Sequence, residues 1–281
     1  MRFLTRIRCP YRPPPGHARD PTGPGGCPAV RPGRQQRRAR DAGSRPGVGM
    51  TEWWLWMYVA AMAGGVVLFS RWRADPRGVP RSEYRVAIAI PLWSGSWYLL
   101  MALGGGRTEV AGHTLYWARY VDWVVTAPLL LVALMLTATH SLPGRCWRLM
   151  GVLAGANVVV ILSGLFADLT ADGAARYTLY AIGVLALLAV YALIWGPLRA
   201  HAHRQPEEIA GVYTEAALLL SALWAGYPVF WILGPSGVGL FSSATTSLLL
   251  VVLSIVSKVG WSILDLGRLR ALSNRGHLTV V

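Results

Sequence analysis

The chain contains 26 arginines but a single lysine, Lys258, which lies among mostly apolar residues. An ammonium group is costly to bury in an apolar stretch, so Lys258 is a candidate functional residue. It lies about eight residues, or about 12 Å of helix, from the end of its stretch, which is far for a side chain to reach water. Desolvation favours the neutral, nucleophilic amine that forms imines. The sequence therefore predicts a Schiff-base lysine that binds an aldehyde cofactor.

A protonated imine inside a membrane needs a negative charge nearby. Asp122 is the one acidic residue well inside another apolar stretch. A spacing of four residues places Asp122, Thr126 and Leu130 on one face of a helix. Arg119 precedes them by one turn, so an alternative interpretation is an Arg119–Asp122 pair that only holds helices together. The lone intramembrane lysine favours Asp122 as a counterion.

Seven stretches of about 20 mostly apolar residues predict helices that cross a bilayer. They cover residues 52–70, 84–103, 114–139, 147–166, 175–195, 213–233 and 241–266. The segments that connect them are short. The predicted fold is therefore an all-α membrane protein, a bundle of seven transmembrane helices.

Arginines alternate between the connecting segments. The first, third and fifth segments and the end of the chain carry Arg71, Arg73, Arg77, Arg81, Arg145, Arg148, Arg199, Arg204, Arg268, Arg270 and Arg275. The second, fourth and sixth segments together contain only Arg107 and Arg176. Because positively charged loops tend to stay in the cytoplasm, the C-terminus is predicted to be cytoplasmic and the N-terminus to be outside.

The composition supports a membrane protein. Of the 281 residues 54% are hydrophobic and only 14% charged, which excludes a disordered chain and disfavours a water-soluble enzyme. The net charge of +14 does not indicate nucleic-acid binding, because no basic stripe with interleaved aromatic residues lies outside the N-terminal tail. The three widely spaced cysteines form neither a disulfide framework nor a metal site, and no bound metal is expected.

Residues 1–49 hold eleven arginines and are rich in proline and glycine. They contain no apolar run that could fold or act as a signal peptide, so we interpret them as a disordered tail. Since this tail would have to cross the membrane, translation is expected to start at Met50. A basic arm that binds lipid or nucleic acid is the alternative. The predicted domains are the tail at 1–49, a seven-helix domain at 50–272 and a cytoplasmic tail at 273–281.

Three motifs resemble those of the microbial, or type 1, rhodopsins. They are Arg119-Tyr-Val-Asp122-Trp-Val-Val-Thr126-Ala-Pro-Leu-Leu, Trp224-x-x-Tyr227-Pro228-x-x-Trp231 and Ser257-Lys258-Val-Gly, in the third, sixth and seventh stretches. They follow the order of the family, and the resemblance covers about residues 52–272. It implies a seven-helix protein that binds all-trans retinal as a protonated Schiff base on Lys258.

The resemblance also implies roles for individual residues. Asp122 would be the primary counterion, supported by Arg119, Thr126 and Ser254. The residues that would line the retinal pocket are Tyr120, Trp123, Leu130, Ser163, Gly164, Tyr180, Trp224, Tyr227, Pro228, Trp231, Pro91 and Ser257. Aromatic residues at helical spacing more often belong to an ordinary packed core. This set indicates a retinal pocket only because the lysine and the aspartate accompany it.

Further motifs resemble the xenorhodopsin group, which includes Anabaena sensory rhodopsin. They are Asp75-Pro-Arg-Gly-Val-Pro, Ile90-Pro-Leu-Trp-Ser-Gly, Ser163-Gly-Leu-Phe-Ala-Asp168-Leu, Trp231-Ile-Leu-Gly-Pro-Ser-Gly and Ser257-Lys-Val-Gly-Trp-Ser-Ile-Leu-Asp265-Leu. Asp265 follows Lys258 by about 10.5 Å of helix, on nearly the same face. In the xenorhodopsin pattern this aspartate takes or gates the Schiff-base proton on the cytoplasmic side. A helix-end charge paired with Arg268 is the alternative.

Three departures from related patterns bear on transport. Outward pumps of the family carry an inner carboxylate on the third helix, where this chain has Ala133. Many relatives have aspartate, and xenorhodopsins usually proline, at the position of Ser254. The external acid pair that serves proton release falls on Ser236 and Thr246. With no inner donor and with Asp265 as an inner acceptor, the resemblance implies a light-driven inward proton pump.

A sensory photoreceptor is the alternative function. The Anabaena relative signals to a soluble transducer, and a docking surface here would comprise Arg199, His201, His203, Arg204 and Arg268. Such charges also follow from the positive-inside rule. Either function implies a non-enzymatic, multi-pass protein of a bacterial cytoplasmic membrane, with retinal, protons and the lipid bilayer as partners and no nucleic acid. A homo-oligomer is compatible with the resemblance, and a seven-helix protein of another class with a structural lysine is a more distant alternative.

Overall fold

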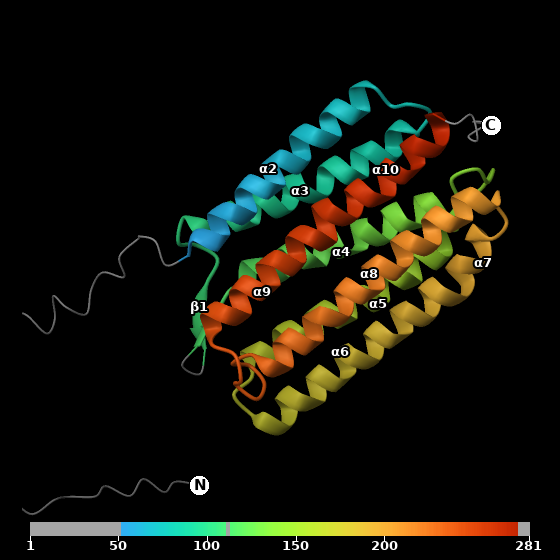
Figure 1. Cartoon of the computed structure of the whole chain (residues 1–281). Coiled ribbons are helices and arrows are strands. Elements are labelled where there is room, and N and C mark those ends of the chain that lie inside the picture. The colour runs from blue at the N-terminus through green and yellow to red at the C-terminus, as the bar shows by residue number, and fades with distance from the viewer. Residues whose placement is uncertain (1–51, 111–112, 275–281) are drawn as a thin grey trace, which may run out of the picture. The chain divides into compact units, whose positions relative to one another are not determined.

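A computed structural model describes residues 52–110 and 113–274 (Figure 1). Its long helices are α2 (Trp53–Ala74), α3 (Arg81–Ala102), α4 (Trp117–Ala138), α5 (Trp147–Leu169), α6 (Gly173–Leu193), α8 (Glu207–Leu233), α9 (Ser243–Ile255) and α10 (Trp261–Asn274). A π-helical turn, η1 (Ile194–Leu198), joins α6 to the short α7 (Arg199–Ala202), and a second, η2 (Val256–Gly260), joins α9 to α10. The predicted disordered tail at 1–49, the predicted start at Met50 and most of the predicted tail at 273–281 lie outside the described residues.

The described chain forms the predicted bundle of seven helical rods. Six rods are long and apolar enough to cross a membrane. The seventh, α3, has 22 residues like α2 and α4, and its first turns carry Arg81, Glu83 and Arg85. From α2 to α6 each helix packs against the next, and α9 packs against α2. Hydrogen bonds of 2.8 Å from Tyr191 and 3.1 Å from Trp195 to Ser221 join the α6 rod to α8.

The start of the third predicted stretch, 114–139, is wrong, because its first residues form part of a β-hairpin. The strands β1 (Thr108–Val110) and β2 (His113–Leu115) are antiparallel and lead directly into α4. Gly106, with φ 67°, lets the chain approach α4 closely, since a Cβ there would lie 2.5 Å from the Cβ of Ala118. The hairpin is thereby held against the start of α4.

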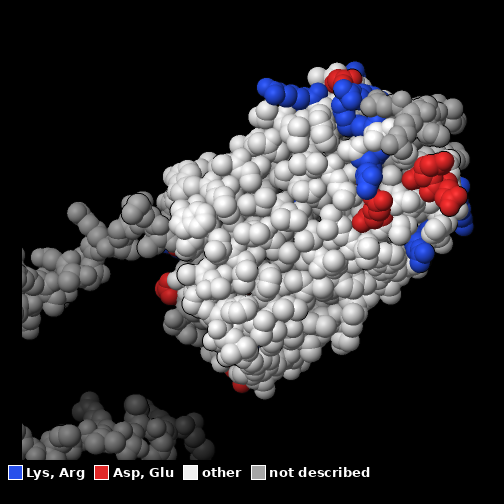
Figure 2. Space-filling view, in the orientation of Figure 1, with Lys and Arg blue, Asp and Glu red and all other residues white. Residues whose placement is uncertain are grey.

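At the opposite end of the bundle several helices extend beyond the predicted apolar stretches. For example, α2 continues to Ala74, α8 begins at Glu207 and α10 reaches Asn274. A hydropathy window detects the apolar part of a helix, whereas the helix itself continues into polar sequence. Figure 2 shows arginine side chains gathered at this end, with a broad uncharged surface beside it. The charge distribution thus favours this end as the cytoplasmic one.

Arg270 of α10 holds this end together. Its side chain is buried and donates hydrogen bonds to the main-chain oxygens of Trp72 (3.1 Å) and Asp75 (2.5 Å) and to the Tyr84 hydroxyl (2.9 Å). The two carbonyls lie at the end of α2, where intrahelical donors run out. Arg270 therefore joins α10 to the end of α2 and to α3.

We expect Arg270→Met to lower the thermal midpoint of unfolding by about 5–10 °C, because buried acceptors lose a charged donor. Circular dichroism of the protein in detergent measures this midpoint. The matched control is Arg268→Met, which removes an exposed arginine whose ion pair with Glu215, 3.0 Å long, is also exposed. That variant should lose less than about 2 °C. Equal losses in the two variants would contradict the role assigned to Arg270.

Candidate functional site

Lys258 lies in η2 and is only 3% exposed. Its Nζ lies 2.5 Å from Oδ2 of Asp122 and donates hydrogen bonds to Oγ of Ser94 (2.8 Å) and to Oη of Tyr58 (3.1 Å). Asp122 is fully buried on α4, on the same face as the buried Thr126. The two residues that the sequence predicts as amine and counter-charge therefore form an ion pair inside the bundle.

The π-helical turn around Lys258 packs against α2 and α3. Single π turns inside helices frequently occur at functional sites. Gly65 of α2 makes room for the turn, since a Cβ there would lie 2.9 Å from Cγ2 of Val259. The same Cβ would lie 3.6 Å from Cβ of Pro91. Pro91, predicted as a pocket residue, thus lies beside the turn and outside the set of residues that line the cavity.

The Asp122 carboxylate is held by a second contact besides Lys258. The Thr126 hydroxyl donates to the main-chain oxygen of Asp122 (2.9 Å) and to its Oδ1 (3.2 Å), as the four-residue spacing suggests. Tyr58 and Ser94 are hydrogen-bonded to each other at 2.6 Å. Sequence analysis assigned neither of them to the site. Ser94 lies within a quoted motif, but its contact with Lys258 spans 164 residues and no local pattern indicates it.

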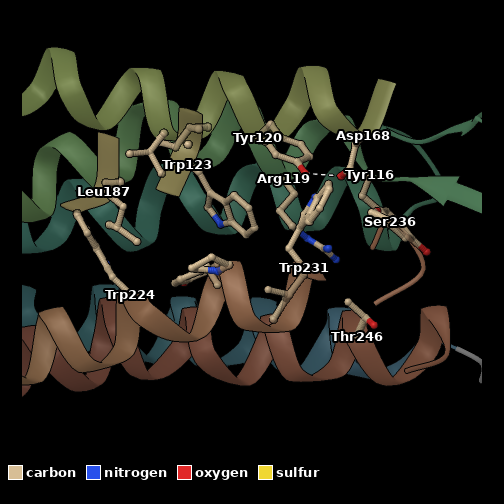
Figure 3. Close-up of a pocket in the computed structure, with 18 of the residues that line it drawn as sticks. Tyr116, Arg119, Tyr120, Trp123, Asp168, Leu187, Trp224, Trp231, Ser236 and Thr246 are labelled. Carbon is tan, nitrogen blue, oxygen red and sulfur yellow. Dashed lines mark hydrogen bonds between the residues drawn. The ribbon is translucent and has the colours of Figure 1, made fainter. Parts of the chain in front are cut away.

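An elongated cavity runs from Lys258 to α5 and α6, and Figure 3 shows part of its lining. Its aromatic walls are Trp123 of α4 and Trp224, Tyr227 and Trp231 of α8. Tyr180 of α6 stacks on Trp231, with ring centroids 4.9 Å apart. These walls make the cavity mostly apolar, and the Lys258 amine is part of its lining.

Most of the predicted pocket residues line this cavity. They are Tyr120, Trp123, Leu130, Gly164, Tyr180, Trp224, Tyr227, Pro228, Trp231 and Ser257, together with the predicted counterion-support residues Arg119 and Thr126. Ser163 lies outside the lining, and its hydroxyl donates to the main-chain oxygen of Val159. This hydroxyl lies close to Gly183, since a Cβ added to Gly183 would be 3.3 Å from it. Gly183 itself lines the cavity.

Ser254 is fully buried one turn before Lys258 and faces α8. The Tyr227 hydroxyl lies within hydrogen-bond distance of Oγ of Ser254 (3.0 Å) and Oγ of Ser257 (3.1 Å). The two serines therefore fix the Tyr227 ring at the edge of the cavity. The structure thus places Ser254 next to the lysine turn, where the sequence predicted a supporting residue.

The outer end of the cavity carries Arg119 and a buried acid on α5. Arg119 is buried and forms no ion pair with Asp122 in the described part of the chain, so the predicted alternative of a structural pair is wrong. The Tyr120 hydroxyl donates to Asp168, which is also buried. Sequence analysis gave Asp168 no role because the predicted stretch ends at residue 166, whereas α5 continues to Leu169.

Tyr116 lies at this outer end, before the first turn of α4. Burial raises the pKa of Tyr116 to about 12, and the hydrogen bond to Glu52 adds to this effect. Its hydroxyl donates to Oε1 of Glu52 over 2.5 Å. Tyr116 therefore stays a neutral donor at physiological pH.

The inner end of the site is centred on Asp265 of α10, which is 3% exposed. Its Oδ1 accepts a hydrogen bond of 2.8 Å from the Thr137 hydroxyl of α4. Arg268 pairs with Glu215 instead, at 3.0 Å, so the predicted alternative of an Asp265–Arg268 pair is wrong. Thr137 follows Ala133 by one turn, and no sequence pattern pointed to it.

A second buried pair lies near the ends of α3 and α4. His140 Nδ1 lies 2.8 Å from Oε1 of Glu83, and both side chains are almost fully buried. Gln205 donates to the main-chain oxygen of Thr137 (3.0 Å) and accepts from the main-chain N–H of Ser141 (2.8 Å). These polar groups were not predicted, because they come together only through helix packing.

The cavity fits a long apolar molecule with a carbonyl group at one end. Lys258 supplies the amine and Asp122 the charge that would balance a protonated imine. Aromatic rings enclose the middle, and the cavity reaches Gly164, Gly183 and Leu187 on α5 and α6. These are the requirements of retinal bound through a Schiff base.

Comparisons with known proteins identify the family. A family model described as bacteriorhodopsin-like protein matches residues 49–272. Sensory rhodopsin-2 of Natronomonas pharaonis is 33% identical over 211 residues, which cover 75% of this chain and 86% of the relative.

Solved structures agree with this family. The thermophilic rhodopsin from Rubrobacter xylanophilus has a TM-score of 0.75 and 35% identity, and the match covers 81% of this chain and 99% of that structure. The light-driven proton pump rhodopsin of Coccomyxa subellipsoidea has a TM-score of 0.69 and 26% identity, with 76% and 94% covered.

The match covers nearly all described residues, so the alternative of a seven-helix protein from another class is excluded. Rhodopsins of this family bind retinal through a Schiff-base lysine, and the only lysine of this chain lies at its aromatic cavity. By sequence and by fold, this chain belongs to the microbial rhodopsin family.

Proposed function

We propose that this protein is a light-driven inward proton transporter of the xenorhodopsin group. The observation that carries the proposal is Asp265, a buried carboxylate between Lys258 and the arginine-rich end of the bundle. Ala133 stands on α4 where the outward pumps of the family carry an inner carboxylate. A chain without an inner donor but with a buried inner acceptor is suited to release protons inward.

All-trans retinal, bound to Lys258 as a protonated Schiff base, supplies light absorption and a change of shape that redirects the N–H at the lysine nitrogen. In the dark, Asp122 holds a negative charge close to that nitrogen, and Thr126 fixes its carboxylate. The rings of Trp123 and Trp224 keep the cavity apolar, so this charge is screened little.

The inward path for the proton runs along the η2–α10 rod. Asp265 lies about 10.5 Å along this rod from Lys258, too far for a direct hydrogen bond. Ser262 lies between them and is buried, with a hydroxyl that has no partner among the described residues. Thr137 donates to Asp265 and orients its carboxylate. Asp265 thus accepts the proton on the inner side, and the Ser262 hydroxyl lies between Asp265 and Lys258 on the path of the proton.

The outward side supplies the replacement proton. The cavity continues past Arg119 to the hydroxyl groups of Thr114, Ser236 and Thr246 at the outer end. None of these three side chains is an acid; the acid that lines this end of the cavity is Asp168, which accepts a hydrogen bond from Tyr120. Asp122 stays ionised or passes a proton inward at this second stage.

The proposal places the protein in a bacterial cytoplasmic membrane, with its N-terminus outside. The arginine-rich end shown in Figure 2 then faces the cytoplasm. An oligomer is compatible with the uncharged surface of the bundle, as for any helix face that contacts lipid or another copy.

A sensory photoreceptor is the second candidate function. The observation that favours it is the relative named Sensory rhodopsin-2, which this chain matches over 86% of that relative's length. In that case the arginine-rich end would contact a soluble transducer. Transport and sensing differ in whether protons cross the membrane, and this can be measured directly.

We expect cells that express the full chain with all-trans retinal to make an unbuffered medium more alkaline under green light. Inward transport removes protons from the medium, and a protonophore should abolish the signal. A pH electrode in the suspension measures it. Acidification would contradict the inward direction, and a coloured protein that leaves the pH unchanged would favour the sensor.

Asp265→Asn tests the inner acceptor. Because asparagine cannot take the proton, loss of the proton from the lysine nitrogen should slow at least about tenfold and the alkalinisation should disappear. Flash photolysis and the pH electrode measure the two effects. The control, Glu207→Gln, removes an exposed acid at the start of α8, at the same end, and should leave both unchanged. A wild-type deprotonation rate and wild-type alkalinisation in Asp265→Asn would refute the assignment.

Two further variants test the Schiff-base pair. Lys258→Ala should give no visible absorption band, because the chain has no other lysine. Asp122→Asn should absorb at longer wavelength at neutral pH, because a neutral amide no longer holds the positive charge at the nitrogen. Absorption spectra of the purified proteins measure both. A wild-type spectrum in either variant would contradict the corresponding role.

A further inference from the structure

The outer half of the site contains more positive charge than its ion pair accounts for. Lys258 and Asp122 neutralise each other at 2.5 Å. Arg119, one turn outward on α4, is 8% exposed and makes no ion pair with a described residue. An arginine stays charged even when buried, and an uncompensated buried charge is strongly unfavourable. Its guanidinium lies 5.3 Å from the centroid of the Tyr116 ring, and a negative charge nearby would compensate it more fully.

The position one turn before the lysine does not supply this charge. Many relatives carry an aspartate there, whereas this chain has Ser254, which contacts the Tyr227 hydroxyl. Among the described residues, the remaining buried acids are Glu83, Asp168 and Asp265. Glu83 pairs with His140, and Asp265 contacts Thr137 at the inner end. Asp168 is thus the buried acid left for the outer half.

The placement of Asp168 suits this role. It lies near the end of α5, is 6% exposed and accepts a hydrogen bond from Tyr120, the residue after Arg119. Its Oδ1 has no partner among the described residues, and neither have Nε and Nη2 of Arg119. Both residues line the cavity, and Figure 3 shows them at the same end, away from Trp224 and Leu187.

Arg176 of α6 is another cation close in sequence to Asp168, but its hydrogen bonds go elsewhere. Its Nη2 donates to the main-chain oxygen of Thr170 (3.0 Å) and its Nη1 to that of Ser236 (3.5 Å). Among the described residues neither Arg176 nor Arg119 forms an ion pair with Asp168, and Nε of Arg176 also has no partner. Arg119 differs in two ways: two of its nitrogens have no partner, and it lines the same cavity as Asp168, whereas Arg176 is not part of that lining. Arg119 is therefore the better candidate for the electrostatic partner of Asp168.

We propose that Asp168 is a positioning residue. Its carboxylate compensates the positive charge of Arg119 and so weakens the electrostatic effect of Arg119 on Asp122. It takes over, from α5, the charge that many relatives place on the seventh helix. The inference rests on the proposed pairing of Lys258 and Asp122, but it does not depend on the direction of transport.

The proposal predicts how the charge on Asp122 responds to acid. The titratable or charged groups around Asp122 are Lys258, Arg119, Tyr58, Tyr98 and Tyr227, and those around Asp168 are Tyr120, Arg119 and Arg176. If Asp168 loses its charge, Arg119 becomes an excess positive charge one turn from Asp122. That charge stabilises the ionised form of Asp122, and acid must then be stronger to protonate it.

The test is the acid-induced colour change of the purified, retinal-loaded full chain. Protonation of Asp122 removes the charge beside the Schiff base and shifts the absorption to longer wavelength. In Asp168→Asn the midpoint of this change should fall by about one pH unit or more. The control Asp172→Asn changes an exposed acid that caps α6, and its midpoint should stay within about 0.3 pH unit of wild type.

Two double variants identify the partner. In an Arg119→Gln background, Asp168→Asn should no longer lower the midpoint, because the positive charge that Asp168 compensates is already absent. In an Arg176→Gln background, the effect of Asp168→Asn should persist. The proposal is overturned by an unchanged or raised midpoint in Asp168→Asn, or by an effect that disappears only when Arg176 is replaced.

If Asp168→Asn alone gives no coloured protein, the charge argument predicts recovery in the double variant Arg119→Gln with Asp168→Asn. Failure of that recovery would also overturn the proposal. The outcome is separable from the proposed function. A colourless wild type would refute the Schiff-base site itself, whereas a coloured protein that pumps outward, or does not pump, leaves the titration fully interpretable.

Discussion

The structure depends on one ion pair, Lys258 with Asp122, buried in a bundle of apolar helices. Removing both charges from water is costly, and the cost is offset only when the pair has good geometry and its remaining hydrogen-bonding positions are filled. Ser94, Tyr58 and Thr126 fill them from three different helices. The packing of α2, α3 and α4 around the seventh rod is therefore a condition for the pair, and the cavity beside the pair follows from it.

The polar groups lie in separate levels along the bundle. An inner level contains Asp265 with Thr137, and an outer level contains Arg119, with Asp168 bonded to Tyr120. Between them lie the ion pair and the aromatic cavity. Because apolar rings separate these levels, a proton can move between them only where a hydroxyl or carboxyl group comes within reach. Each of the two levels contains a buried carboxylate, Asp265 at the inner level and Asp168 at the outer one.

Much of this was predictable from sequence. Lys258, Asp122 and the aromatic spacing of Trp224, Tyr227 and Trp231 are local patterns, and the seven rods follow from hydropathy. The hairpin before α4 was not predicted, because the predicted apolar stretch begins at residue 114 and so takes the end of β2 as the start of a helix. The contacts of Lys258 with Tyr58 and Ser94, and the pairing of Thr137 with Asp265, join distant segments. They depend on how helices rotate against each other, which one sequence does not encode in any local spacing.

The scarcity of lysine has a practical consequence. Lys258 is 3% exposed, so the folded protein offers no lysine amine on its surface to reagents that acylate amines in water. Coupling to amine-reactive beads, cross-linkers or dyes is confined to the α-amino group. Conversely, reductive trapping of any aldehyde ligand would modify one known residue. The mass of a single peptide would then report the fraction of molecules that carry the ligand.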